Sequence, residues 1–241
     1  MDTEQQTTPP GKHPPLPAAV LGRLAGLVSH DICNPFNAIF LHTDLLEEDL
    51  QQLPPQVREP MLASLAEVKT EVGRLQALIQ DYLILGRLGE LTYQPEMLEH
   101  IVASCRMEMH TLCETRELSI HLEGLADLPQ VALHRSSITQ ALSNILRQAL
   151  STTPPGGTVT IRGRQDSGYA CLEIKDSGPG MSPEDVAGLF EPWNATHVDG
   201  STLAMYVAQA ISIAHGGRLT VQSAPGQGTV FTLHLPCIEA A

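Results

Sequence analysis

A histidine, an aspartate and an asparagine lie close together in the stretch SHDICNPFNAI, near the N-terminus. His30 lies two positions from the apolar residues Val28 and Ile32, so on a helix it points away from their side. Asn34 follows one turn later on the face of His30. An imidazole beside a carboxylate, here that of Asp31, is a good nucleophile toward phosphorus, and an amide one turn away can position a water. From its position alone, an ordinary solvent-exposed histidine is the alternative.

A second group of acidic and small residues, DSGPGM, follows an alternating strand pattern. Asp176, at the end of that strand, can accept a hydrogen bond from the amino group of an adenine. Gly178 and Gly180 let the backbone approach a purine without Cβ clashes. Alone, the pattern also fits a plain turn after a strand, so its interpretation depends on what accompanies it.

Two long amphipathic helices are expected to carry the histidine. Apolar residues recur at spacings of three and four from Leu21 to Leu50, and again from Met61 to Tyr82. The stretch QLPPQVREP between them interrupts the helix, whereas Pro35 is expected to bend the first helix without ending it. This pattern predicts an α-helical hairpin that pairs with a second copy into a dimeric four-helix bundle.

The remainder of the chain mixes helix and strand patterns. The expected elements are a helix over Pro95 to Thr115, a strand at LSIHLEG, a helix over Ser136 to Ser151 capped by Ser136 or Ser137, a strand hairpin around QDSG, a short helix from Pro183, a helix over Leu203 to His215, and a closing hairpin in GRLTVQSAPGQGTVFTLHLP. Without a βαβ repeat, this order predicts an α+β sandwich with helices over one face of a sheet.

These patterns divide the chain into three parts. Residues 1–16 are polar and rich in proline, and are expected to form a disordered leader. Residues 17–91 form the helical hairpin, and residues 92–241 form the α+β domain. No sensory domain is expected within this chain, so a separate sensor protein is the expected source of any signal.

Composition limits the partners and the location. The formal net charge of −13 argues against nucleic acid as a main partner. No apolar run reaches the length of a membrane span, so we expect no membrane partner. The five cysteines form no C-x-x-C pair, which is typical of unpaired thiols in a reducing cytosol, and we expect a cytoplasmic protein.

Taken together, the motifs resemble those of the two-component sensor histidine kinases. SHDICNPFNAI is similar to the H-box of the dimerisation and phosphoacceptor domain, with Phe36 where leucine is usual. Downstream, NILRQA resembles the N-box, DSGPGM the G1 box, LFEPW the F-box and GSTLAMYVAQAISIAHGG the G2 box of the Bergerat (GHKL) ATP-binding fold, which gyrase B, Hsp90 and MutL share. The resemblance covers about residues 20–236.

The resemblance implies roles for individual residues. His30 would be phosphorylated, Asp31 would activate it, and Asn34 would support hydrolysis of the phosphorylated response regulator. The implied cofactors are ATP and Mg²⁺, and the implied partners are a response-regulator receiver domain and a second copy of the chain. Asn144 and Gln148 stand at the Mg²⁺ positions. The other implied ATP-binding residues are Asp176, Gly178, Gly180, Met181, Gly200, Leu203 and Thr229, with Thr229 supporting Asp176 through a water.

Two of these boxes depart from the family pattern. Gln148 replaces the second asparagine of the N-box, and its longer side chain suits the strict octahedral geometry of Mg²⁺ less well. The G2 box keeps only Gly200 of its three glycines, since Thr202 and Ala204 occupy the others. His197 stands where a phosphate-contacting lysine is frequent, and an ordinary loop histidine is the alternative. The adenine half of the site is therefore better preserved than the phosphate half.

Three functions are compatible with this pattern. The first is an ATP-dependent histidine kinase acting on His30, with phosphatase activity supported by Asn34. The second is a histidine phosphotransfer protein or scaffold on a kinase-like fold, which would use ATP weakly or not at all. The third, a gyrase-like or chaperone ATPase, leaves the H-box hairpin without a purpose.

Overall fold

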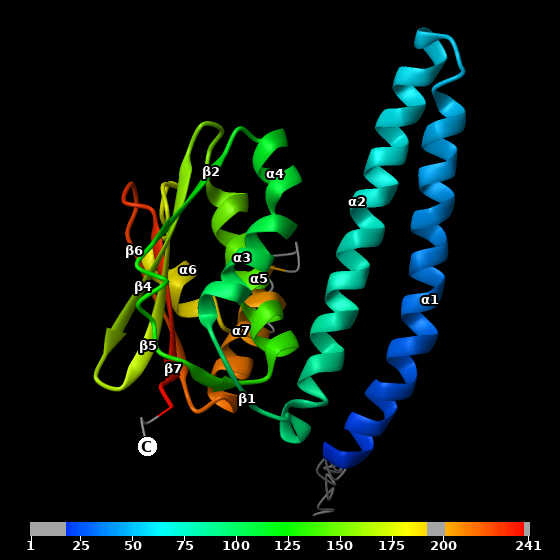
Figure 1. Ribbon diagram of the computed structural model, residues 1–241. Helices are drawn as coiled ribbons and strands as arrows, with labels where there is room; N and C mark the ends of the chain where they lie inside the picture. The colour runs from blue at the N-terminus through cyan, green and yellow to red at the C-terminus, as the bar shows by residue number, and fades with distance from the viewer. Residues whose placement is uncertain (1–17, 192–200, 239–241) are drawn as a thin grey trace, which may run out of the picture.

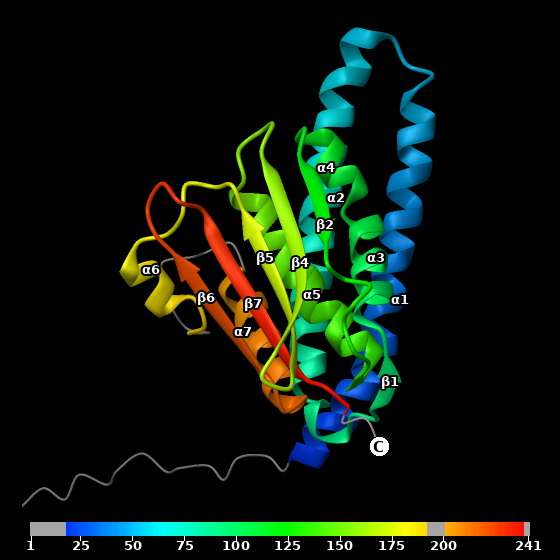
Figure 2. The same ribbon diagram turned by 60° about the vertical axis from the view of Figure 1, so that its left-hand side comes forward.

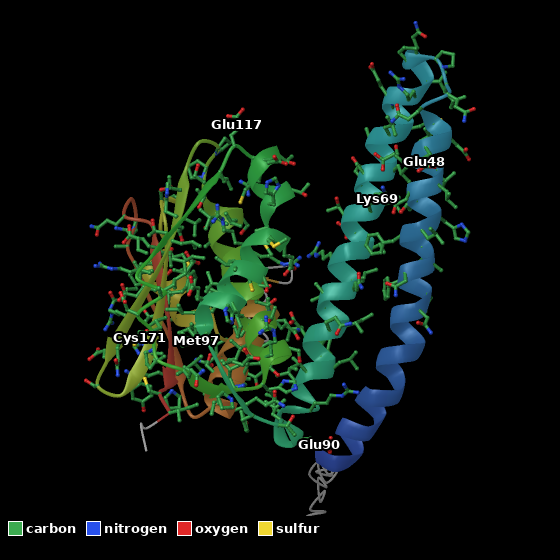
Figure 3. All side chains as sticks on the ribbon, in the orientation of Figure 1. Glu48, Lys69, Glu90, Met97, Glu117 and Cys171 are labelled. Carbon is green, nitrogen blue, oxygen red and sulfur yellow. The ribbon has the colours of Figure 1, made fainter. Side chains whose placement is uncertain are left out.

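The hairpin consists of helices α1 (Ala18–Leu50) and α2 (Pro55–Leu85). The computed structural model describes residues 18–191 and 201–238, with side chains for 34–191 and 203–238; the expected leader, residues 1–16, lies outside this part. Pro35 lies inside α1, which continues to Leu50 as expected. Lys69 of α2 reaches across to α1 (Figure 3) and pairs with Asp44, at 2.7 Å, and with Glu47. These ion pairs are exposed to solvent, so the apolar contact between the two helices contributes more to holding them together.

Two rows of side chains run along the hairpin, and the exposed Leu41, Leu45 and Val57 lie outside both. One row packs between the helices and includes Thr43 and Leu50 on α1, both buried, and half-buried residues of α2. The other row is exposed and repeats every seven residues. It comprises Ile39, Leu46 and Leu53 from the α1 side and Met61, Val68, Leu75 and Tyr82 from α2. A seven-residue repeat is the spacing of a helix–helix seam, so this hairpin carries a second apolar face.

The second domain is a two-layer sandwich. Its helices are α3 (Leu98–Glu108), α4 (His110–Thr115), α5 (Arg135–Thr152), α6 (Pro183–Gly188) and α7 (Ser201–Ala214), and the short 3-10 helix η1 (Leu88–Glu90) precedes it at the end of the hairpin segment. Its strands are β1 (Gln94–Glu96), β2 (Ser119–Glu123), β3 (Val131–Leu133), β4 (Thr158–Asp166), β5 (Tyr169–Asp176), β6 (Arg218–Ser223) and β7 (Thr229–Pro236). Five strands form a sheet in the order β2-β4-β5-β7-β6, with β2 parallel to β4 and the other pairs antiparallel.

Helices α3, α5 and α7 cover one face of this sheet, on the side of the hairpin, as Figures 1 and 2 show. The core between the layers is fully buried and apolar, with Leu142 and Ile145 from α5 facing Leu172 and Phe231 from the sheet. The expected α+β sandwich with helices over one face is confirmed.

Some of the helices and strands expected from the sequence are confirmed, and others are not. The helix expected over Pro95 to Thr115 is wrong at its start, because Pro95 lies in β1 and pairs with Ala132 of β3. Neither β1 nor β3 was anticipated, since three-residue strands are too short to show an alternation. The expected hairpins are confirmed, as is the short helix α6, in which Ser182 and Asp185 form a capping box.

The start of α5 also differs from expectation. Its N-cap is His134, with no side-chain cap hydrogen bond, and neither Ser136 nor Ser137 fills that position. A tertiary contact fixes this end of the helix, because the backbone N–H of His134 donates to Nε2 of the buried His215, at 3.0 Å. Nδ1 of His215 lies 2.8 Å from the carbonyl oxygen of Ile211. His215 therefore joins the end of α7 to the start of α5.

The hairpin and the sandwich are in contact through α2, which lies between α1 and α7 (Figure 1). Near the linker, the Tyr93 hydroxyl donates to the carbonyl oxygen of Ala214 at the end of α7, at 2.8 Å. No helix among residues 18–191 and 201–238 is both long and apolar enough to cross a membrane.

Candidate functional site

The histidine constellation lies on the first helix of the hairpin. The backbones of His30 and Asp31 are helical within α1, and Asn34 follows on the next turn with an exposed side chain. The side chains of His30 and Asp31 lie outside those described. The sequence expectation that His30 and Asn34 share a helix is confirmed, and the segment is not interrupted by Pro35.

Asp176 is the best-defined element of the second constellation. It ends β5 and is only 2% exposed. Its Oδ1 accepts hydrogen bonds from the backbone N–H groups of Gly178, at 2.8 Å, and Thr229, at 3.0 Å. Thr229 thus contacts Asp176 directly through its backbone, and its implied support through a water stays a prediction. The other carboxylate oxygen, Oδ2, is buried and has no hydrogen-bond partner among the described residues.

An unpaired buried carboxylate oxygen is costly, by about 1–3 kcal/mol or more, and so indicates a missing donor. Burial raises the pKa of Asp176, while the backbone hydrogen bonds from Gly178 and Thr229 oppose that rise. An amino group of a purine would supply the donor that Oδ2 lacks. The residues present therefore fit the adenine end of a nucleotide.

Glycines allow several backbone segments to converge on Asp176. Gly180 has a φ of +72°, and a Cβ there would overlap the carbonyl oxygen of Ala224. Gly228 also has a φ of +72°, and a Cβ there would overlap the backbone carbonyl oxygen of Asp176 itself. Sequence reasoning singled out Gly180 but missed Gly228, although the GQG triplet before the last strand was a visible turn signal.

Ser223, which sequence reasoning also missed, connects these segments. The backbone N–H of Met181 donates to its Oγ, at 2.8 Å. The same hydroxyl lies 2.9 Å from the carbonyl oxygen of Gly228 and 3.0 Å from Oγ1 of Thr229. The half-buried Met181 packs against the core. The residues Asp176, Gly178, Gly180, Met181 and Thr229 are therefore brought together as expected.

Substituting Gly228 tests this convergence. Gly228→Ala should lower the free energy of unfolding by about 1–2 kcal/mol for the positive φ and by about 1–3 kcal/mol more for the overlap with Asp176. Gly226→Ala is the matched control, since Gly226 has a φ of +78° in the same loop but nothing within 4 Å of its Cβ position. Urea unfolding of the three proteins measures the difference. Equal losses in the two variants would contradict the close packing.

The N-box residues lie on α5, on the side that faces α2 and α7. Asn144 and Gln148 are one turn apart, and both are half-buried. Nδ2 of Asn144 donates to Oδ1 of Asp81 on α2 and to the carbonyl oxygen of Ala204 on α7, each at 3.0 Å. No described residue donates a hydrogen bond to the side-chain oxygen of Asn144 or to that of Gln148. Two amide oxygens are therefore available on one face, and Mg²⁺ prefers oxygen ligands.

Helix α5 connects these amides to the adenine end. One turn beyond Gln148 lies Thr152, whose carbonyl oxygen would be 2.9 Å from a Cβ on Gly178. The face of α5 that begins at Asn144 thus ends against the turn after Asp176. The structure places the two halves of the expected nucleotide site in line along one helix, with the amide oxygens at one end and Asp176 at the other.

The phosphate-binding segment is only partly described. Gly200 and His197 lie outside the described residues, and α7 begins at Ser201. Leu203 is half-buried and packs against the core, and Ala204 contributes its carbonyl oxygen to Asn144. Met205 is fully buried. The start of α7 is thus held against α5 by the hydrogen bond between Asn144 and Ala204.

Asp81 was not anticipated from the sequence. It is 3% exposed, and its Oδ1 accepts hydrogen bonds from Gln140, at 2.7 Å, and Asn144, at 3.0 Å. Burial raises the pKa of Asp81, and the hydrogen bonds from Asn144 and Gln140 oppose that rise. A single aspartate beside an apolar helical stripe gives no sequence signal, because a solvent-exposed position is its usual explanation.

Comparisons with known proteins agree with this geometry. Residues 20–91 match the family model of the His Kinase A (phospho-acceptor) domain. Residues 134–239 match that of the histidine kinase-, DNA gyrase B- and HSP90-like ATPase. Among solved structures, that of full-length ShkA in complex with AMPPNP is similar with a TM-score of 0.69 at 24% identity, over 91% of this chain and 47% of that one.

Curated proteins of similar sequence are kinases by name. The chain is 27% identical over 224 residues to Sporulation kinase E of Bacillus subtilis, covering 92% of this chain and 29% of that protein. It is 28% identical over 219 residues to the Sensor histidine kinase ZraS of Salmonella typhi, covering 90% of this chain and 46% of that protein. The chain therefore spans less than half the length of these relatives.

Proposed function

The chain carries the catalytic core of a two-component histidine kinase, and we propose that it phosphorylates His30 from ATP and passes the phosphoryl group to an aspartate of a response-regulator receiver domain. The observation that carries this proposal is the buried, unpartnered Oδ2 of Asp176 at the end of a glycine-lined turn. It supplies the acceptor that an adenine amino group requires, in a domain joined to a histidine-bearing hairpin.

In the proposed reaction, a ring nitrogen of His30 forms a bond to the γ-phosphorus of ATP. The bond from that phosphorus to the bridging oxygen breaks, and ADP leaves with the bridging oxygen. Asp31 accepts the proton from the imidazole or holds the ring in the reactive tautomer. Asn34, exposed one turn along, would position a water when the regulator's phosphoaspartate is hydrolysed.

For nucleotide binding, we assign the adenine to Asp176, Gly178, Gly180, Met181 and Thr229. The phosphates are assigned to the segment from Gly200 to Leu203 at the start of α7, where backbone N–H groups favour anions. Asn144 and Gln148 would hold Mg²⁺ through their amide oxygens. When bound, the metal neutralises phosphate charge as the P–O bond breaks.

A histidine phosphotransfer protein or scaffold remains the second candidate, because Gln148 and the lost G2 glycines weaken the phosphate half. Calorimetry with ADP separates the two candidates. Tight Mg²⁺-dependent binding supports the kinase. Absence of binding in a folded protein supports the phosphotransfer alternative.

Restoring the family pattern should raise kinase activity if the departures limit it. We expect the triple variant Gln148→Asn, Thr202→Gly, Ala204→Gly to label His30 about tenfold faster, equivalent to about 1.4 kcal/mol in the barrier. Initial rates with labelled ATP and Mg²⁺ give the measurement. The double variant Thr202→Gly, Ala204→Gly separates the metal ligand from the phosphate cradle. An unchanged rate in the triple variant would mean that these positions do not limit the reaction.

We further propose that the chain is a homodimer through the hairpin. The exposed row that repeats every seven residues, Ile39 through Tyr82, is the apolar face that a second hairpin would cover. We propose the same domain boundary as before, with the hairpin over residues 17–91 and the ATP-binding domain over residues 92–241. We also expect the protein to be cytoplasmic and to receive its signal from a separate sensor protein.

Charges on the exposed row should separate the two copies. Val68→Asp together with Leu75→Asp should yield a monomer, since each apolar side chain contributes about 1.5–3 kcal/mol when buried and a carboxylate there is costly. Leu41→Asp is the matched control, because Leu41 is exposed on the same hairpin but lies off the row. Sedimentation equilibrium gives the mass of each protein. A double variant that stays dimeric would place the interface elsewhere.

A further inference from the structure

Asp81 is a charged side chain in an unusual place. It belongs to the hairpin, yet its carboxylate accepts hydrogen bonds from two residues of the other domain, Gln140 and Asn144 of α5. Burying a carboxylate costs several kcal/mol unless it is well compensated. No described lysine, arginine or histidine forms a salt bridge with it, so two neutral amides provide the hydrogen bonds. Such a placement is poorly explained by stability alone, because an apolar residue could fill the same position.

The contact with Asn144 fixes how that amide is oriented. The –NH₂ group of Asn144 has two hydrogens and two acceptors, Asp81 Oδ1 and the carbonyl oxygen of Ala204. Rotating the amide by half a turn would place its oxygen against both acceptors. The carbonyl oxygen must therefore face away from Asp81 and Ala204, where no described residue donates to it. In metal sites, a group that hydrogen-bonds to a ligating side chain orients that side chain in the same way and increases the basicity of its ligating atom.

We propose that Asp81 is a positioning residue of the nucleotide site, which fixes the Asn144 amide so that its oxygen is presented to the metal of a bound Mg²⁺–nucleotide. The proposal rests on the metal role proposed above for Asn144. Because Asp81 lies on α2, the site is complete only when the ATP-binding domain is docked on the hairpin. Metal-dependent nucleotide binding and the position of the domain are then coupled, since each favours the other.

The alternative is that Asp81 weakens nucleotide binding. A carboxylate at the phosphate end of the site adds negative charge, so Asp81 could instead restrain binding of a triphosphate. The two outcomes differ in direction. Removing a positioning residue weakens Mg²⁺–nucleotide binding, whereas removing a restraint strengthens it.

Calorimetry of ADP with the intact 241-residue chain, with Mg²⁺ and again with EDTA, tests the proposal. We expect Asp81→Ala to weaken binding about tenfold with Mg²⁺, the usual loss for an outer-shell residue, and to leave binding in EDTA unchanged. Asp81→Asn should retain part of the Mg²⁺ effect, because its side-chain oxygen can still accept from Asn144. Glu67→Gln, an exposed carboxylate of α2, is the control and should match wild type. In an Asn144→Ala background, Asp81→Ala should add no further loss.

A second readout needs no nucleotide. The chain has four asparagines, Asn34, Asn37, Asn144 and Asn194, so ¹⁵N-asparagine labelling gives four side-chain amide signals. Asn144→Ala identifies the signal of Asn144. That signal should shift in Asp81→Ala and stay in place in Glu67→Gln. An unmoved signal, or Mg²⁺–ADP binding in Asp81→Ala that equals or exceeds wild type, overturns the proposal. A wild type that binds no nucleotide refutes the proposed function, and the Asn144 signal then still decides whether Asp81 holds the amide.

Discussion

His30→Gln should abolish the acid-labile phosphoryl label that the wild-type protein acquires from ATP and Mg²⁺. The P–N bond requires an imidazole nitrogen, and the amide of glutamine is not a nucleophile at neutral pH. The expected loss is therefore complete. Incubation with γ-labelled ATP, followed by acid and alkaline washes, measures it, since phosphohistidine and phosphoserine differ in their stability.

His42→Gln is the matched control, because His42 lies on the same helix with an exposed side chain. It should keep the label at the wild-type level. ADP affinity should also be unchanged in His30→Gln, because the nucleotide residues lie on α5, α7 and the sheet. A label that survives in His30→Gln would assign the phosphoacceptor to another residue. A wild type that binds Mg²⁺–ADP and takes no label would favour the phosphotransfer alternative.

Asp176→Asn should change which purine the protein binds. The variant keeps the size of the side chain and an oxygen that can accept from Gly178 and Thr229, so the fold should persist. The atom at the position of Oδ2 becomes an –NH₂ donor, which faces the amino donor of adenine. We expect ADP affinity to fall about ten- to a hundredfold, because a hydrogen bond to a charged group contributes about 1.5–3 kcal/mol.

Inosine diphosphate tests the direction of this hydrogen bond. Its ring carries an oxygen acceptor where adenine carries the amino group, so it pairs with a donor and not with a carboxylate. Wild type should prefer ADP, and Asp176→Asn should lose or reverse that preference. Asp127→Asn, an exposed carboxylate of the same domain, should leave both affinities unchanged. Equal loss of both nucleotides in Asp176→Asn would indicate a structural role for Asp176 and not base recognition.

The hairpin shows which features the sequence alone could predict. Spacings of three and four predicted two long helices, and both exist, because periodic burial of apolar side chains dominates the choice of a long helix. The sequence could not say which apolar residues pack inside the hairpin and which stay exposed. Thr43 and Leu46 lie on the same stripe, yet only Thr43 is buried. The position of α2 relative to α1 decides that difference.

The nucleotide site shows the same division. Asp176 and Gly180 stood out because their types and spacing within one short segment suit a purine. Ser223 and Gly228 did not, since their roles depend on β6 and β7 returning to the end of β5. The N-cap prediction for α5 was wrong for a related reason, because the cap position falls on His134, whose backbone N–H donates to His215 just after α7.

By itself, the sequence determined the elements and the chemistry that is local to one segment: the histidine helix, the acidic strand end, the glycine turn and the amides one helical turn apart on α5. Residues a few positions apart within one helix or turn are also close in space, so their spacing in the sequence was enough to place them together. The tertiary structure decided the rest. Only there is Oδ2 of Asp176 buried without a hydrogen-bond partner among the described residues, and only there does Asp81 of the hairpin meet Asn144, sixty-three positions along the chain. A buried polar group is defined by what surrounds it, and its surroundings come from segments that the sequence does not place together.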